Sequence, residues 1–136
     1  MNVTSNMRAL HAALICIFCL ATASFSARAD VKDYEFQLVQ SEMKEGAGAI
    51  ITVRLVNRKT SKSVSGAVIF AKRIDMAPDG MANMTEAIEQ MPSTEPGEYR
   101  FKVNLSMEGR WQLSLGAKVQ GETGSVKNEL VLKATP

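Results

Sequence analysis

Alternating apolar and polar residues are the dominant pattern along this chain. The clearest run has an apolar residue at every second position: Tyr99, Phe101, Val103 and Leu105. A second alternating run starts at Trp111, immediately after the tight-turn sequence at residues 107–109. This pattern is typical of half-buried antiparallel strands, so it predicts two such strands joined by a short turn.

Five further segments have shorter apolar runs bounded by turn residues. They are Tyr34 to Leu38, Ile51 to Leu55, the more continuously apolar Gly66 to Ala71, a weaker run from Thr85 to Met91, and Ser125 to Lys133. No stretch keeps a helical period, and no internal repeat or second domain is visible. The sequence therefore predicts an all-β fold, an immunoglobulin-like antiparallel β-sandwich of about seven strands. An open β-meander barrel is the alternative.

The N-terminal segment has the composition of an export signal. Residues 1–8 carry one positive charge and no acid, residues 9–23 are almost wholly apolar, and Ala27-Arg28-Ala29 has the small-x-small form that signal peptidase accepts. The apolar run is shorter than the roughly 20 residues that span a bilayer, which favours cleavage over an uncleaved anchor. We predict a cleavable signal peptide at residues 1–29, a mature domain at 30–136 and a periplasmic location.

Cleavage would change the charge and the available chemistry. Arg8 and Arg28 are lost from the 16 basic residues, so 14 remain against 14 acidic ones. A near-neutral domain has no basic surface for nucleic acid. Both cysteines and the histidine are also lost, so the exported fold does not depend on disulfides. The carboxylates are scattered and no nucleophile motif occurs, so we expect that the protein is not an enzyme.

Methionine is the residue type that suggests a chemistry. Six of the eight methionines follow residue 29, and three of these lie within the stretch 75–84. If each predicted strand reverses its predecessor, the connections after the first, third and fifth strands meet at one end of the domain. Those connections carry Met43, Met76, Met81, Met84 and Met107. Met91 falls at the opposite end. The inference requires the weak run at residues 85–91 to be a strand, because otherwise Met107 changes ends relative to Met76.

Thioether sulfur is a soft, uncharged ligand suited to Cu(I). Because Pro78 and Gly80 bend the chain, the spacing of Met76, Met81 and Met84 could bring three sulfurs around one ion, with Met43 or Met107 completing the site. We therefore predict a Cu(I) site that would also suit Ag(I). Two other roles fit the same residues: methionine fills irregular gaps in cores, and it can form a protein-interaction surface.

Three nearby residues bear on this site. Trp111 begins the strand just after Met107, so its ring could cover a bound cation through a cation–π contact. The alternative is a place in the core, which is favoured because Trp111 lies on the apolar face of its strand. Asp75 and Asp79 flank the methionine loop. Their carboxylates could assist Cu(II), whereas the Asp-Gly pair at residues 79 and 80 is typical of a turn.

Two blocks of sequence resemble the FixH/YtkA-like family. The first is residues 66–71 with 75–84, and the more specific second block is Pro-Gly-x-Tyr at 96–99 followed by Met-x-Gly-x-Trp at 107–111. The resemblance covers most of the mature chain and implies an exported β-sandwich associated with heavy-metal efflux systems of the resistance-nodulation-division type, or with assembly of copper-containing oxidases. Members of the FixH branch keep an N-terminal transmembrane helix, so a cleavable signal fits the soluble YtkA-like branch better.

The residues and the resemblance together predict a periplasmic copper-handling accessory protein. It would bind Cu(I) through the methionines and supply it to, or buffer it for, a membrane efflux or copper-assembly complex. The alternative is a docking module that binds such a complex through the same end without a metal. Neither function requires nucleic acid or direct insertion into the membrane after cleavage.

Overall fold

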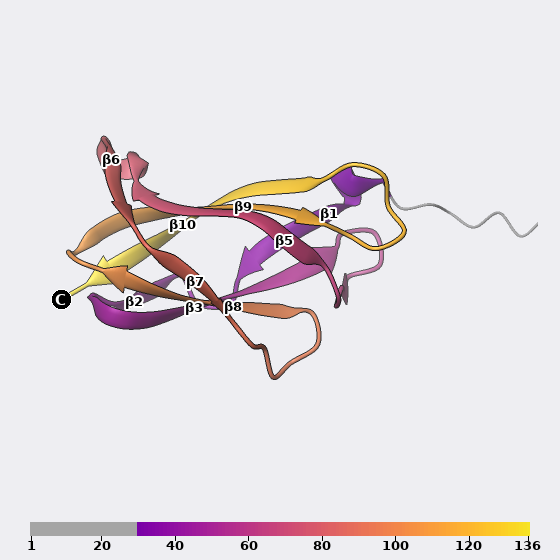
Figure 1. The fold of residues 1–136 in the computed structure, drawn as a ribbon, viewed down its shortest axis with the longest axis horizontal. Helices are drawn as coiled ribbons and strands as arrows, with labels where there is room; N and C mark the ends of the chain where they lie inside the picture. Colours follow the sequence, from indigo (N-terminus) through magenta and orange to yellow (C-terminus); the bar gives the residue numbers. More distant parts are fainter. Residues whose placement is uncertain (1–29) are drawn as a thin grey trace, which may run out of the picture.

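The computed structural model describes residues 30–136, which form a sandwich of two β-sheets (Figure 1). The predicted signal peptide lies outside the described residues. The first sheet has the order β1-β3-β8-β7, with β4 paired to β3, and the second has the order β2-β10-β9-β5-β6. Strands of the first sheet are β1 (Tyr34–Leu38), β3 (Gly46–Asn57), β4 (Lys62–Ser63), β7 (Ile88–Met91) and β8 (Glu98–Leu105). Strands of the second are β2 (Glu42–Lys44), β5 (Val68–Met76), β6 (Met81–Glu86), β9 (Gly109–Lys118) and β10 (Val126–Thr135).

The strand order is that of an immunoglobulin-like sandwich. In that fold, strands A, B, E and D form one sheet and C, F and G form the other. Here β1, β3, β8 and β7 take the first set of positions, and β5, β9 and β10 take the second. The predicted fold class is confirmed, and the open meander barrel is wrong because the strands form two separate sheets.

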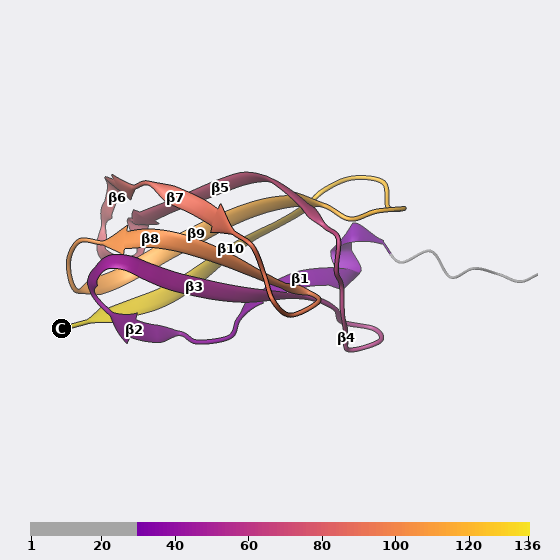
Figure 2. The ribbon, with the colours of Figure 1, turned by 60° about the horizontal axis from the view of Figure 1, so that its bottom comes forward.

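The described residues contain ten strands where the sequence predicted about seven. Two of the additional strands are short: β2 has three residues and β4 has two. The third arises because the weak run predicted at residues 85–91 is divided at Ala87, where the chain leaves the second sheet as β6 and enters the first as β7 (Figure 2). The run keeps its direction, so Met91 pairs with Arg100 at the start of β8, away from the β8–β9 turn.

Alternation along β8 and β9 determines which side chains form the core. Trp111, Phe101, Leu105 and Leu113 are all fully buried, as the alternation predicted. The indole of Trp111 lies inside the sandwich and donates a hydrogen bond from Nε1 to the Met107 carbonyl oxygen at 3.1 Å. Its alternative position over a surface-bound cation is therefore wrong.

The strand predicted at residues 66–71 begins later and extends further than expected. As β5, it runs from Val68 to Met76. Only its last three residues, 74–76, are buried, and residues 68–73 are exposed except for half-buried Ile69. Tyr99 fixes the chain just before it, because its hydroxyl donates to the Val64 carbonyl at 2.9 Å and accepts from the Ala67 amide at 3.0 Å.

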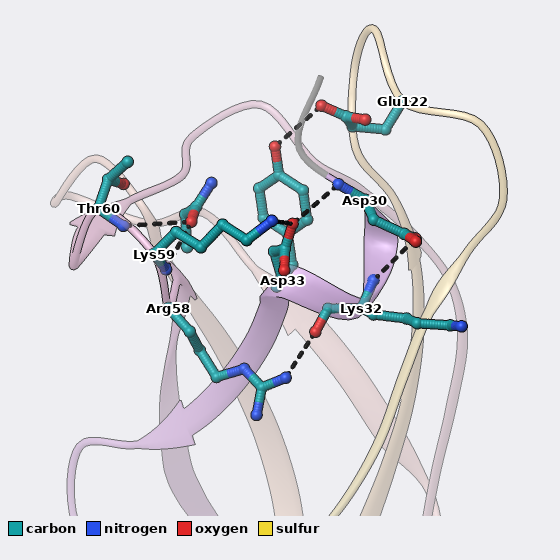
Figure 3. A network of polar contacts seen from close by, with 9 residues as sticks. Asp30, Lys32, Asp33, Arg58, Lys59, Thr60 and Glu122 are labelled. Carbon is teal, nitrogen blue, oxygen red and sulfur yellow. Dashed lines mark hydrogen bonds and ion pairs between the residues drawn. The ribbon is translucent and has the colours of Figure 1, made fainter. Parts of the chain in front are cut away.

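A polar network fastens the start of the described chain to the body of the domain (Figure 3). Asp30 caps the short 3₁₀-helix η1 (Val31–Asp33), and its own backbone N–H donates to Asp33 Oδ2 at 2.9 Å. The same carboxylate forms a 2.8 Å ion pair with Lys59, which holds the pKa of Asp33 below its ordinary value. Tyr34 donates to Glu122 at 3.0 Å. The first described residues are thus bonded to the β3–β4 and β9–β10 connections. Within residues 30–136, no helix is long and apolar enough to cross a membrane.

Candidate metal site

Three methionine-bearing segments lie at the same end of the sandwich, as the succession of strands predicted (Figures 1 and 2). They are β2, the β5–β6 hairpin and the β8–β9 turn. The register connects β2 to the β8–β9 turn, because Met43 pairs with Ala134 and Ala134 pairs with Gly109. It connects the hairpin to the same strand β9, because Asp75 pairs with Gln112. We call this region the methionine end, defined by Met43, Met76, Met81, Met84 and Met107.

The β5–β6 hairpin brings two of these residues together. Met76 and Met81 are Cα partners across a connection formed by the 3₁₀-helix η2 (Ala77–Asp79) and Gly80. Pro78 lies in the first turn of η2, where its fixed φ is favourable. Gly80 has φ 77°, a left-handed conformation that glycine adopts at little cost. Proline and glycine therefore bend the chain here as the sequence predicted.

Met76 is a core residue. Its side chain is fully buried, and its Cε methyl group lies over Gly109. A Cβ atom added at Gly109 would be only 2.6 Å from that methyl group. The space left by the missing side chain of Gly109 is thus filled by Met76, which is the packing role that the sequence left open for these methionines.

The other four methionines lie nearer the surface. Met81 is 37% exposed, while Met43, Met84 and Met107 are half-buried and pack against the edge of the core. Met84 is the last residue of the stretch of β6, residues 82–84, that the register shift leaves unpaired with β5. The five predicted ligands therefore lie at different depths, and four of them are within reach of solvent.

Asp75 stabilises the hairpin through both of its carboxylate oxygens. Oδ1 accepts a hydrogen bond from the Ala77 amide at 2.9 Å, and Oδ2 accepts one from Arg73 Nε at 2.7 Å. Arg73 also donates to the Ala82 carbonyl at 2.9 Å, so it ties β5 to β6. Since Asp75 is only 4% exposed, its carboxylate has a structural role in this hairpin.

Asp79 is held by Arg110 from the neighbouring strand β9. Its Oδ2 accepts from the Arg110 amide at 2.7 Å and its Oδ1 accepts from Arg110 Nε at 2.8 Å, while Arg110 Nη2 donates to the Pro78 carbonyl at 2.7 Å. The backbone and guanidinium donors of Arg110 lower the pKa of Asp79. Sequence reasoning identified the Asp-Gly turn but missed Arg110, because only the sheet register brings it to the hairpin.

Substitution Asp79→Asn is expected to destabilise the fold at neutral pH and to have little effect in acid. The pKa of Asp79 is lowered from 3.8 in the folded state, so its ionic contribution is present above that value and is lost as the pH falls through the folded pKa. Urea denaturation of both proteins at a series of pH values, from neutral down to the most acidic pH at which both still fold, measures the difference. A difference that stays the same at every pH would contradict an ionic role for Asp79.

Groups of three or more His, Cys, Asp or Glu side chains that could hold a metal ion are absent from residues 30–136. The predicted thioether ligands are a different donor class, and metal binding by them stays a prediction.

A family model described as YtkA-like matches residues 28–116, a range that contains all five methionines of the methionine end. The chain belongs to the YtkA-like family. A solved structure described as ZirS C-terminal Domain is similar to this YtkA-like protein at 15% sequence identity and a TM-score of 0.46, covering 100% of this chain and 88% of that chain. No curated protein matches the chain.

Proposed function

We propose that this YtkA-like domain is a periplasmic, non-enzymatic copper-handling protein. It binds Cu(I), and Ag(I) by the same chemistry, through thioethers of the methionine end, and it supplies or buffers the ion for a membrane heavy-metal efflux system. One observation carries the proposal: four methionines from three segments, β2, β6 and the β8–β9 turn, are exposed or half-buried at the same end of the sandwich. These are Met43, Met81, Met84 and Met107.

The chemistry of the surrounding side chains supports a soft cation over a hard one. Both oxygens of Asp75 and both of Asp79 accept hydrogen bonds within the hairpin and from β9. The methionines of this end offer thioether sulfur, which prefers Cu(I) and Ag(I) to the divalent ions that favour oxygen or nitrogen. Met76 is buried in the core at the base of the hairpin, where an ion from solvent does not reach it. The four more exposed methionines are therefore the proposed ligands.

Titration with Cu(I) tests this function directly. In the presence of a reductant, the domain is expected to bind about one ion, with nearly the same affinity at mildly acidic and neutral pH because thioethers do not titrate. Competition with a chromogenic Cu(I) chelator measures both quantities, and Zn²⁺ is the control ion. Failure to compete for Cu(I) would contradict the proposal and favour a metal-free docking module at the same end.

Export predicts a defined new N-terminus. Cleavage after Ala29 would convert the Asp30 backbone N–H, which lies 2.9 Å from Asp33 Oδ2, into a charged ammonium group facing that carboxylate. The ordered start of the fold therefore accommodates the cleaved product. Intact-mass analysis of periplasmic protein is expected to find a chain beginning at Asp30. Recovery of the full-length chain in the membrane fraction would contradict export with cleavage.

A further inference from the structure

The outer face of the second sheet carries exposed apolar side chains. On β9, Leu113 and Leu115 are buried in the core, so the residues between and beyond them, Ser114 and Gly116, lie on the outer face. The register places neighbours from β5 and β10 on the same face. Three of the five large apolar side chains exposed within residues 30–136 lie here: Val68, Phe70 and Val131. Apolar side chains gathered on one face indicate an interaction surface.

Small residues on β9 leave a trough between longer side chains of the two neighbouring strands (Figure 1 shows the three strands side by side). The trough has a volume of about 580 Å³, with Gly116 and Ser114 on its floor, Ala71 and Arg73 on the β5 side, and Lys127 and Glu129 on the β10 side. The ring of Phe70 crosses one end of this floor, because a Cβ added at Gly116 would be 3.0 Å from Phe70 Cζ. The face thus has a hollow and, beside it, an aromatic ring held in place.

Two neighbouring charges on this face have opposite signs. Lys127 and Glu129 are both exposed on β10, and neither takes part in the ion pairs of residues 30–136. Arg73 is already bound, to Asp75 at 2.7 Å and to the Ala82 carbonyl at 2.9 Å. A partner of one charge sign would meet repulsion from either Lys127 or Glu129. A partner with the same two charges in reversed order would complement both.

We propose that two copies of this chain pack their outer faces together as a two-fold dimer. A second copy turned by 180° presents the same charges in reversed order, and a two-fold interface is self-complementary in this way. If the axis crosses the strands at the level of Leu115, Lys127 of each copy faces Glu129 of the other. On β9, Gly116 then faces Ser114 of the second copy, so the two sheets can approach closely.

The same axis gives Phe70 a place in the dimer. Its ring lies over Gly116, so it faces the trough of the second copy at Ser114, beside Arg73. An arginine next to an aromatic ring adds a cation–π contact. Each copy thus supplies one ring and one hollow. The contact uses none of the five methionines of the methionine end and does not depend on copper.

The size of the face sets the expected strength of the dimer. Three strands about 4.8 Å apart and about nine residues long give a surface of roughly 15 by 30 Å. This area is at the lower end of specific protein interfaces. We therefore expect a reversible dimer with a Kd of about 10–100 μM.

Sedimentation equilibrium of the purified protein, with a metal chelator present, measures the association. The mass is expected to rise from that of one chain toward that of two between about 1 μM and 1 mM protein. Lys127→Glu and Glu129→Lys each place like charges opposite one another in both symmetric pairs, so each is expected to weaken the dimer at least about tenfold. A parent protein that stays monomeric up to about 1 mM would overturn the proposal.

The exchanged pair tests the two-fold arrangement itself. The double variant Lys127→Glu/Glu129→Lys restores opposite charges across the axis and has the net charge of the parent, so it is expected to dimerise within about threefold of the parent. An equimolar mixture of the two single variants is also expected to associate, because each copy again meets the opposite charge. A double variant as weak as the single variants would overturn this pairing.

Matched variants elsewhere on the surface complete the test. Phe70→Ser is expected to weaken the dimer at least about tenfold. Val39→Ser removes an apolar side chain that is 51% exposed between β1 and β2, and Lys62→Glu makes the same charge change on β4; both are expected to dimerise as the parent does. Equal loss in these controls, or a dimer that every variant leaves unchanged, would overturn the assignment to the outer face.

Discussion

Trp111→Ala is expected to lower the free energy of unfolding by about 3–5 kcal/mol, the usual loss when a large buried aromatic side chain is truncated. The indole is fully buried and is the largest such side chain of the described residues. The substitution removes its apolar contacts, leaves a cavity and deprives the Met107 carbonyl of a donor at 3.1 Å. Urea denaturation of the metal-free protein measures the loss.

Val131→Ala is the matched control for this experiment. Val131 is 49% exposed on β10, so its truncation is expected to change stability by less than about 0.5 kcal/mol. A Trp111→Ala protein as stable as the parent would contradict burial of the indole. It would also return the ring to the surface, where it could cover a cation.

The period of two in the sequence was enough to predict the faces of the longest strands. Residues 99–105 and 111–119 alternate strictly, and their apolar members are buried in the structure. Alternation records which side chains avoid water, but it does not record which sheet a strand joins. The pattern therefore could not predict that residues 85–91 are divided between β6 and β7, because the chain keeps its direction across the division.

The apolar run at residues 66–71 shows a second limit of the pattern. A continuous apolar strand is typical of a strand buried on both faces. Here Val68 pairs with exposed Lys118, and the ring of Phe70 lies against Gly116, so both apolar side chains are on the outer face of the second sheet. No element of the described residues covers that face, and both side chains stay exposed.

The candidate site was predictable at the level of segments. Antiparallel succession placed the three methionine-bearing connections at one end without knowledge of the strand order. The depth of each residue was not predictable, because Met76 is buried over Gly109, a neighbour 33 positions away in sequence that has no side chain. The ion pair between Arg110 and Asp79 was not predictable for the same reason, because both contacts depend on the packing of β9 against the hairpin.

Leucine replacements at Met81, Met84 and Met107 are expected to abolish high-affinity Cu(I) binding while the fold survives. Leucine keeps a similar volume and apolarity, so each change usually costs under about 1.5 kcal/mol even in a packed site, whereas the thioether ligands are lost. We expect competition against a Cu(I) chelator to weaken by at least about 100-fold, or about 2.7 kcal/mol.

Met76→Leu is the control that the structure supplies. Because this side chain is fully buried over Gly109, its replacement is expected to lower the unfolding free energy slightly and to leave Cu(I) affinity within about threefold of the parent. The opposite result, with copper lost in Met76→Leu and kept in the triple variant, would place the ion in the interior. Equal competition by all the variants would exclude the methionine end as a copper site and leave the docking module as the better function.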